Sequence, residues 1–246
     1  MDRLIYVAMT GAKQLMQAQS LVSNNLANIG TNGFRADLAR FSALQVEGPG
    51  YASRVNSIAN GLGFDSTPGT LVETGNVLDV AIDGSGWIAV QAPDGTEALT
   101  RDGALRINAL GLLETRRGDL VLGDNGPLAI PPHVELAIGR DGTISIVPQG
   151  QGAETLAQVG RIKLVDPDPA TLEKRTDGRV QVAGGAAAEP DGRVRIVSGF
   201  VETSNVNGAE MLVNMIELAR QFEIEVRMMR VADENASRAA DLVRLS

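Results

Sequence analysis

Apolar residues recur at helical spacing at both ends of the chain. Between residues 2 and 29 the steps alternate between three and four, and no proline interrupts them. The positions are Ile5, Ala8, Ala12, Leu15, Gln19, Val22, Leu26 and Ile29. This heptad repeat predicts one helix, roughly 40 Å long, whose single stripe faces a partner and includes Gln19 as a polar member.

A second stripe lies near the C-terminus. Its positions are Leu212, Met215, Ala219, Phe222, Val226, Met229, Asp233, Ala236, Ala240 and Val243. They predict a helix over about residues 207–244, roughly 55 Å long, with Asn205 or Asn207 as its N-cap and Asp233 as a polar interruption. Neither stripe is wide enough to build a core alone, so we expect the two helices to pair as a coiled-coil-like domain.

The middle of the chain changes to short β-branched runs separated by turn residues. These runs predict strands at residues 77–82, 87–92, 104–108, 134–138, 143–147, 159–165, 179–183 and 194–197. Asp-Gly occurs six times, at residues 83, 94, 102, 141, 177 and 191. The glycine of this dipeptide readily adopts the positive φ of tight hairpin turns, which favours antiparallel pairing. We therefore expect a central all-β, mainly antiparallel domain and an α+β fold class.

The expected domain organisation follows from these patterns. Residues 1–33 form the N-terminal helix of the helical domain, and residues 201–246 complete that domain. Residues 73–200 form the β domain. Residues 34–72 are interpreted as an extended connecting arm, because the stretch 48–69 holds five glycines and two prolines and has little periodicity.

Composition excludes several classes of function. The 246 residues have a hydrophobic fraction of 43% and a net charge of −8, which is ordinary for a globular protein and disfavours a nucleic-acid partner. The absence of cysteine excludes thiolate chemistry, and a single histidine excludes sites with two imidazoles. We expect no membrane insertion, because no apolar run approaches 18 residues. We also expect no cleaved signal peptide, because the first apolar run lacks a cleavage pattern.

Candidate chemistry is sparse. Residues 84–89 fit the G-x-G-x-x-A pattern of a dinucleotide loop, but a strand pattern follows where a helix should begin, so a hairpin is favoured over a cofactor loop. His133 is interpreted as a surface-loop residue rather than a base. Asp166 and Asp168 alternate with prolines, which favours a rigid turn over a calcium site. We predict no catalytic residue, no cofactor and no metal.

An asparagine-rich motif ends the first predicted helix. It consists of Asn24, Asn25, Leu26, Ala27 and Asn28, followed by Thr31, Gly33 and Phe34. By itself this is a helix stop, since asparagine tolerates left-handed backbone and caps exposed carbonyls. A second motif precedes the C-terminal helix and contains Ser204, Asn205, Val206 and Asn207, and a third spans residues 73–87.

Together the three motifs resemble, nearly end to end, the rod and hook proteins of the bacterial flagellum. The resemblance implies a structural subunit without catalysis, exported uncleaved by the flagellar type III apparatus and assembled into the periplasmic rod of the basal body. Its implied partners are copies of itself and other proximal and distal rod subunits, through which it transmits motor torque. Residues 1–9, 34–41 and 218–223 look most like the proximal-rod branch, with the distal-rod paralogue as the competitor.

The resemblance also implies that the terminal helices line the inner layer of the rod. The residues expected in this assembly seam are Ile5, Leu15, Val22, Leu26, Ile29, Leu212, Met215, Phe222, Val226 and Met229. Two other interpretations stay open. One is a carbohydrate-active enzyme domain with Trp87 and Asp83 lining its site, which would require paired acids in a cleft. The other is a free coiled-coil adaptor that remains a monomer or a closed dimer.

Overall fold

The computed structural model describes residues 2–45, 55–150, 156–175 and 177–244. The chain divides into two compact units. The helical unit comprises Met1–Asn28, Ala36–Phe64 and Val206–Ser246, and the β unit comprises Ile29–Arg35 and Asp65–Asn205. The α+β class is confirmed, with the two long terminal helices packed together and antiparallel sheets between them in sequence.

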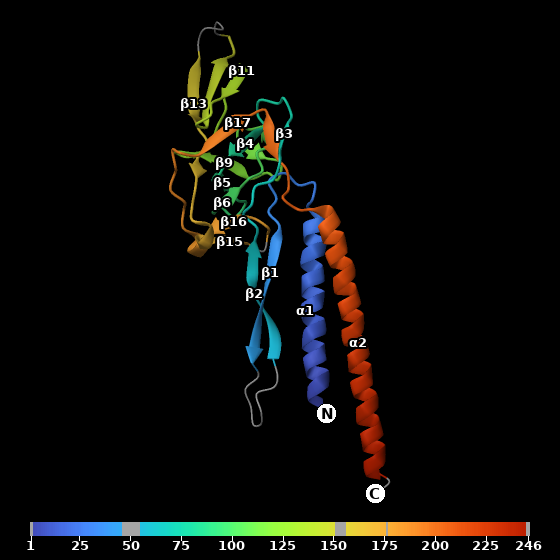
Figure 1. Cartoon of the computed structure of the whole chain (residues 1–246). Coiled ribbons are helices and arrows are strands. Elements are labelled where there is room, and N and C mark those ends of the chain that lie inside the picture. Colours follow the sequence, from blue (N-terminus) through green and yellow to red (C-terminus); the bar gives the residue numbers. More distant parts are fainter. Residues whose placement is uncertain (1, 46–54, 151–155, 176, 245–246) are drawn as a thin grey trace. The chain divides into compact units, whose positions relative to one another are not determined.

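The helical unit is built on two long helices, α1 (Asp2–Ala27) and α2 (Gly208–Arg244). They run antiparallel and side by side (Figure 1). The bounds agree closely with the periodicity of the sequence. Asn207 caps α2, because its Oδ1 accepts hydrogen bonds from the backbone N–H groups of Ala209 at 3.1 Å and Glu210 at 3.4 Å.

A hairpin accompanies the helices in this unit. Strands β1 (Asp37–Gln45) and β2 (Val55–Phe64) pair antiparallel with a bulge between Ala39 and Phe41, and both contact α1. The sequence had instead suggested an extended arm over residues 34–72. The glycines at 61 and 63 obscure the alternation of β2, and an isolated two-stranded ribbon is marginal without a packing partner. The adjacent helix supplies that partner.

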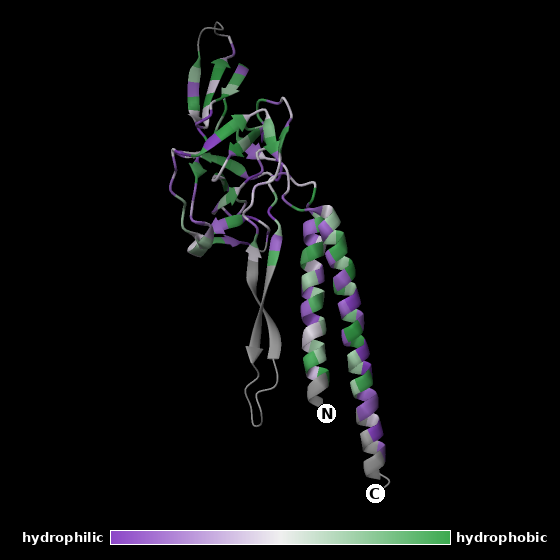
Figure 2. Ribbon diagram, in the orientation of Figure 1, coloured by the Kyte–Doolittle hydropathy of each residue, from purple (hydrophilic) through white to green (hydrophobic). Residues whose placement is uncertain are grey.

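The β unit contains the remaining strands, and every strand pair among its described residues is antiparallel. The largest sheet has the order β15-β16-β6-β5-β9-β8-β7, with β10 on β9 and β14 on β5. A second sheet has the order β11-β12-β13, and β17-β4 and β18-β3 form two further pairs. Apolar residues concentrate on these strands (Figure 2).

The strands have the following bounds. They are β3 (Leu71–Glu73), β4 (Val80–Asp83), β5 (Trp87–Gln91), β6 (Glu97–Thr100), β7 (Leu105–Ile107), β8 (Leu113–Thr115), β9 (Leu120–Gly123), β10 (Gly126–Pro127), β11 (His133–Ile138), β12 (Thr143–Pro148), β13 (Ala157–Arg161), β14 (Leu164–Val165), β15 (Leu172–Lys174), β16 (Val180–Val182), β17 (Arg195–Ser198) and β18 (Phe200–Glu202). Two 3₁₀ turns, Pro169–Thr171 and Ala183–Gly185, complete the unit. Each run predicted as a strand overlaps an observed one, and residues 159–165 divide between β13 and β14.

One apolar core holds the β unit together. Its fully buried members include Ile88, Leu113, Val121, Ile144 and Ile162, which come from four strands of the two larger sheets and from the link between β13 and β14. Burying a side chain of this size stabilises the fold by about 1.5–3 kcal/mol. Within the described residues, no helix is both long enough and apolar enough to cross a bilayer.

Three of the six Asp-Gly pairs make the predicted hairpin turns. Gly95, Gly142 and Gly178 have φ values of 83°, 86° and 81° and connect β5 to β6, β11 to β12 and β15 to β16. The pairs at residues 83, 102 and 191 lie in connections between strands that do not pair with each other, so the hairpin prediction is wrong there. Gly103 serves close packing instead: a Cβ atom there would lie 1.6 Å from the backbone oxygen of Val80.

Replacement of Gly103 by alanine is expected to lower the free energy of unfolding of the β unit by about 3 kcal/mol, because the new methyl group collides with backbone that cannot rotate away. Chemical denaturation followed by Trp87 fluorescence measures the change. Gly192→Ala is the matched control, since Gly192 also follows aspartate but has open space around it. It should alter the unfolding free energy by no more than about 0.5 kcal/mol. Equal stability of the two variants would contradict the packing role of Gly103.

Candidate functional site

The contact between α1 and α2 uses small residues. A groove of about 460 Å³ runs between the helices and is lined by Gly11, Gln14, Leu15, Ala18, Leu218, Gln221, Ile224 and Glu225. A Cβ atom on Gly11 would lie 3.1 Å from Oε1 of Glu225, which shows how closely the carboxylate approaches the helix. Ala8, Ala12 and Ala18 are buried on the same helix. Short side chains therefore set the separation of the pair.

The buried positions agree with the predicted stripe at Ala8 and Ala12 but are displaced by one residue further along the helices. On α1 the structure buries Ala18 and Asn25, while Gln19 and Leu26 are only partly buried. On α2 it buries Ala232, and the neighbouring Asp233 is exposed. The apolar pattern favoured the larger side chains, whereas close helix packing selects the adjacent column of small ones. The polar Asp233 consequently stays in solvent.

The residues predicted for the seam fall into two groups. Partly buried are Ile5, Leu15, Val22, Leu26, Met215, Phe222, Val226 and Met229. Ile29 and Leu212 are exposed, at 43% and 51%. Ile29 lies beyond the end of α1 in the β unit. Leu212 is exposed, whereas the preceding Met211 is partly buried and its Sδ lies 4.0 Å from Nδ2 of Asn25. The role of Ile29 and Leu212 in assembly stays a prediction.

Both helices expose large apolar side chains on surface that the pair itself does not cover. On α1 these are Tyr6, Met9 and Met16, and on α2 they are Leu212, Val213, Ile216, Ile224, Met228 and Val231. Figure 2 shows hydrophobic residues along the length of both helix ribbons. A helix that is amphipathic on one face only would keep such positions polar. The helical unit therefore presents apolar surface suited to contact with other chains.

Two residues of the asparagine motif have different structural roles. Asn25 is buried, and its amide makes a two-bond bridge to the backbone of Asp37: Nδ2 donates to the oxygen at 3.0 Å and Oδ1 accepts from the N–H at 2.8 Å. This bridge joins α1 to the start of β1. Asn28 instead closes the end of α1, since its Nδ2 donates to the backbone oxygen of Asn24 at 2.9 Å. Asn28 thus performs the helix-stopping role expected from the sequence.

Gly33 and Phe34 join the first motif to the second inside the β unit. The N–H of Gly33 donates to the backbone oxygen of Glu202 at 2.8 Å, and the N–H of Asn205 donates to the oxygen of Phe34 at 3.3 Å. The φ of Gly33 is 65°, and a Cβ there would lie 2.1 Å from the carbonyl carbon of Arg101. The side chain of Asn205 donates to the backbone oxygens of Asp65 and Thr67 at 3.1 and 3.0 Å. The segments that lead to α1 and α2 therefore lie side by side.

The remaining motif residues are distributed around these contacts. Val206 is buried, Leu26, Thr31 and Ser204 are partly buried, and Asn24, Ala27 and Asn207 are exposed. Asn207 acts as the N-cap described above, whereas Asn205, the alternative cap, holds the loop at residues 65–67. The two asparagines that the sequence could not separate thus have different functions.

A buried ion cluster lies beside this junction. Glu202, only 1% exposed, forms an ion pair with Arg35 at 2.6 Å through Oε1 and another with Arg101 at 3.0 Å through Oε2. Its Oε1 also accepts the N–H of Gly69 at 2.7 Å. The guanidinium carbons of Arg35 and Arg101 lie 5.9 and 5.6 Å from the centre of the Trp87 ring. One carboxylate therefore holds two arginines against one indole ring.

The sequence interpretation did not identify this cluster. Its members stand inside or next to the quoted motifs: Arg35 follows Phe34, Glu202 precedes the Ser204 motif, and Trp87 ends the third. Charged residues next to such motifs were the available signal. Burial lowers the pKa of Arg101 and raises the pKa of Asp102 from their ordinary values.

The other candidate chemistry is placed as follows. Trp87 begins β5, so a strand follows the G-x-G-x-x-A stretch as expected. Asp166 accepts from the hydroxyl of Ser85 at 2.7 Å, and Asp168 caps a 3₁₀ turn, which agrees with a rigid turn. His133 is the first residue of β11 rather than part of a loop. The described residues contain no group of three acidic or histidine side chains arranged to hold a metal.

A carbohydrate site built on Trp87 and Asp83 is contradicted by the geometry. The Trp87 ring is 6% exposed and faces the two arginines, whereas Asp83 is exposed at the end of β4. A sugar-stacking ring needs an open face. The pair therefore forms no such cleft.

Family comparisons agree with this junction of terminal segments. Residues 5–35 match the family model "Flagella basal body rod protein", residues 81–146 match "Flagellar hook protein FlgE/F/G D1 domain", and residues 197–242 match "Flagellar basal body rod FlgEFG protein C-terminal". These three stretches contain both helices in large part and many of the strands between them. They define a flagellar axial protein.

Curated relatives extend the match to the whole chain. The flagellar basal-body rod protein FlgF of Escherichia coli K12 is 39% identical over 252 residues, and that of Salmonella typhimurium LT2 is 40% identical, each with full coverage of both chains. The rod protein FlgG of Buchnera aphidicola subsp. Acyrthosiphon pisum is 33% identical, with 97% of this chain and 98% of the relative covered. The chain belongs to the flagellar basal-body rod protein family. It is a non-enzymatic, FlgF-like structural rod subunit.

Replacement of Glu202 by glutamine is expected to lower the free energy of unfolding of the β unit by about 3–5 kcal/mol, because two buried arginines lose their counter-charge. Urea denaturation monitored by Trp87 fluorescence measures it. Glu234→Gln is the control, since Glu234 belongs to an exposed pair with Arg238 at 3.9 Å and should contribute at most about 1 kcal/mol. A Glu202→Gln variant as stable as the control would refute a structural role for the cluster.

Proposed function

We propose that this chain is a subunit of the proximal part of the flagellar rod that polymerises through its terminal helices and transmits motor torque. The observation that carries the proposal is the apolar surface left on α1 and α2 after they have packed together. Residues such as Met9, Met16, Ile216 and Met228 are exposed in the single chain. Contacts with copies of the chain and with other rod subunits would bury them.

Assembly of an open polymer needs two different surfaces on each subunit. A contact between two unlike surfaces leaves one of each surface free at the ends of the assembly. Repetition of the contact gives a closed ring if its rotation closes, and an open helical filament if it does not. The helical unit offers separate apolar columns on α1 and α2, which meets this requirement. A free adaptor that remains a monomer or closed dimer would leave one of these columns in solvent.

A proximal position is supported by similarity to the FlgF relatives, at 39% and 40%, compared with 33% for the FlgG relative quoted above. The distal rod is the second candidate, because FlgG relatives also match almost the whole chain. Export through the flagellar type III apparatus into the periplasm, without membrane insertion or nucleic-acid partners, completes the proposal. The proposed export route rests on membership of the flagellar basal-body rod family.

The substitution Ile216→Asp is expected to prevent incorporation into the rod while leaving the chain folded. Ile216 is 56% exposed, so a carboxylate is solvated in the free subunit but would be buried without a partner in the polymer. The measurements are the amount of the variant in purified basal bodies, swimming in soft agar, and helix content by circular dichroism. We expect loss of incorporation and motility with unchanged helix content.

The neighbouring substitution Glu217→Ala is the control, because Glu217 is also exposed on α2 but polar. It should incorporate and support motility as the unchanged chain does. Normal incorporation of Ile216→Asp would contradict assembly through this column. Loss of helix content would instead assign Ile216 to folding.

The position of the subunit separates the two rod candidates. We expect an epitope-tagged chain that complements motility to be detected at the inner-membrane end of the rod in purified basal bodies by immunoelectron microscopy. Labelling confined to the outer-membrane end would assign the chain to the distal rod and overturn the proximal assignment.

A further inference from the structure

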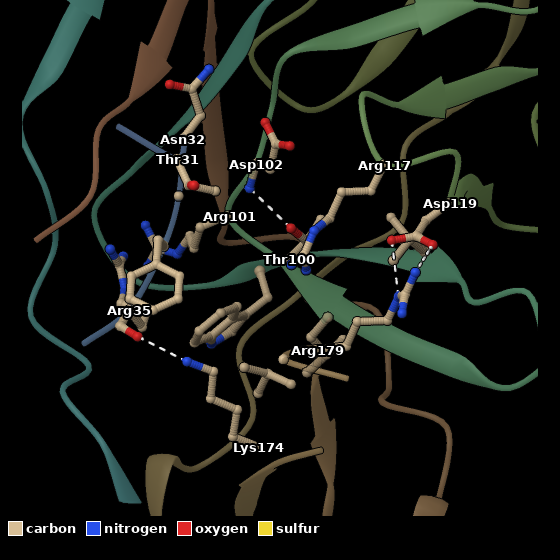
Figure 3. A pocket seen from close by; sticks show the side chains of 17 residues that line it. Thr31, Asn32, Arg35, Thr100, Arg101, Asp102, Arg117, Asp119, Lys174 and Arg179 are labelled. Carbon is tan, nitrogen blue, oxygen red and sulfur yellow. Dashed lines mark hydrogen bonds and ion pairs between the residues drawn. The ribbon is translucent and has the colours of Figure 1, made fainter. Parts of the chain in front are cut away.

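A small cavity in the β unit lies against the buried ion cluster. Its volume is about 40 Å³, and it is bounded by the segment 31–35, by β5, β6 and β16, and by the turns near Arg101 and Arg117 (Figure 3). One water needs roughly 10–15 Å³ by this measure, so the space accepts a few waters or one ion of chloride size.

The lining of the cavity is predominantly cationic. The positively charged side chains are Arg35, Arg101, Arg117, Lys174 and Arg179, against the carboxylates of Asp102 and Asp119. The Asp119 carboxylate is taken by Arg179, which donates to it at 3.0 and 2.6 Å. Glu202, behind the wall, is shared between two arginines. Lys174 donates to the backbone oxygen of Arg35 at 3.1 Å. Arg35 and Arg101 therefore place two positive charges in the wall against one carboxylate, in a chain whose net charge is −8.

Arginine donors in the wall also lack hydrogen-bond partners. Arg35 is 2% exposed, and its Nε and Nη1 have no partner among the described residues; the same holds for Nε of Arg101. An unpaired buried donor on a charged group costs at least about 1–3 kcal/mol. The Trp87 ring attracts the guanidinium groups but accepts no strong hydrogen bond in their plane.

We propose that this cavity binds a monatomic anion of chloride size, held by Arg35 and Arg101. Water would satisfy the free donors but would leave the excess charge, whereas an anion satisfies both. The site is separate from the helix surfaces that carry the proposed assembly. Its occupancy would stabilise the junction from which the segments to both helices depart, since Arg35 and Glu202 belong to those segments.

Trp87 provides a selective reporter, because it is the only tryptophan of the sequence and lies against both arginines. Iodide is the probe, as a heavy anion that quenches indole fluorescence on contact. The full-length chain is titrated with sodium iodide at constant ionic strength in sodium gluconate, whose anion is too large for the cavity. We expect saturable quenching, reversed by chloride. Chloride at about ten times its own Kd should raise the iodide midpoint about tenfold.

Two variants test the assignment of the residues. Arg35→Gln leaves Glu202 paired with Arg101 alone, so it removes the charge excess of the cluster without leaving a carboxylate unpaired; saturable quenching should disappear. Arg193→Gln is the matched control, because Arg193 is 87% exposed and does not line the cavity. It should quench as the unchanged chain does. Linear quenching unaffected by chloride in the unchanged chain, or saturable quenching retained in Arg35→Gln, would overturn the proposal.

A second measurement covers the case in which Arg35→Gln does not fold. Thermal unfolding of the unchanged chain is compared in sodium chloride and sodium gluconate at equal ionic strength. We expect the Tm to be higher in chloride than in gluconate and, above the Kd, to rise in proportion to the logarithm of the chloride concentration. A Tm that is the same in both salts at every concentration would show that chloride does not bind the folded chain, and would overturn the proposal independently of the variants.

Discussion

The buried carboxylate of Glu202 is the interaction on which the architecture of the β unit depends most. It binds Arg35 from the segment that follows α1 and Arg101 from the turn after β6, and Glu202 itself ends β18 shortly before α2. Residues far apart in the sequence are thus joined at one point. Hydrogen bonds from Gly33 to Glu202 and from Asn205 to Phe34 reinforce the same junction. The junction therefore joins the segment that follows α1 to the segment that precedes α2 within the β unit.

A buried ion cluster is a weak source of net stability but a strict geometric constraint. Removing three charges from water costs several kcal/mol per ion, and their attraction only partly offsets this. Apolar side chains of similar volume would pack in more than one way, whereas the forked guanidinium groups accept few arrangements around a carboxylate. The Trp87 ring restricts them further, because both groups must lie near it. The cluster therefore restricts the geometry of the junction more than it adds net free energy.

The sequence predicted the elements of this protein better than their contacts. Both long helices follow from the three-and-four spacing, and the central strands follow from β-branched runs, because these periods are local properties of the chain. The predicted column Met215, Phe222 and Met229 rests on the same local spacing, and these residues are partly buried. The adjacent column was not: Gly11 and Ala18 form the contact through their small size, and a search for apolar bulk passes over them. Small residues are required there because a second helix lies close by, and the spacing of residues within one helix does not show which of its faces that second helix contacts.

The Glu202 cluster and the β1–β2 hairpin were missed for a related reason. Arg35, Arg101 and Glu202 are 66 to 167 positions apart in sequence, so no spacing rule connects them. The hairpin is a two-stranded ribbon that contacts α1, and its strands carry little alternation of their own. For half of the Asp-Gly pairs the hairpin prediction was wrong, because the glycine permits a positive φ or a close backbone approach but does not determine which of the two occurs. At Gly103 that use is close approach to Val80 rather than a turn.

The two units use different kinds of side chain at their most closely packed points. In the helical unit, small side chains bring α1 and α2 close together and leave large apolar ones outside, so the surface available for neighbours is made by the same packing that forms the pair. In the β unit, charge replaces apolar packing where the terminal segments meet. In the proposed polymer, apolar helix faces would accept neighbours in slightly different arrangements, because hydrophobic contact is non-directional. The junction in the β unit depends instead on directional bonds to Glu202.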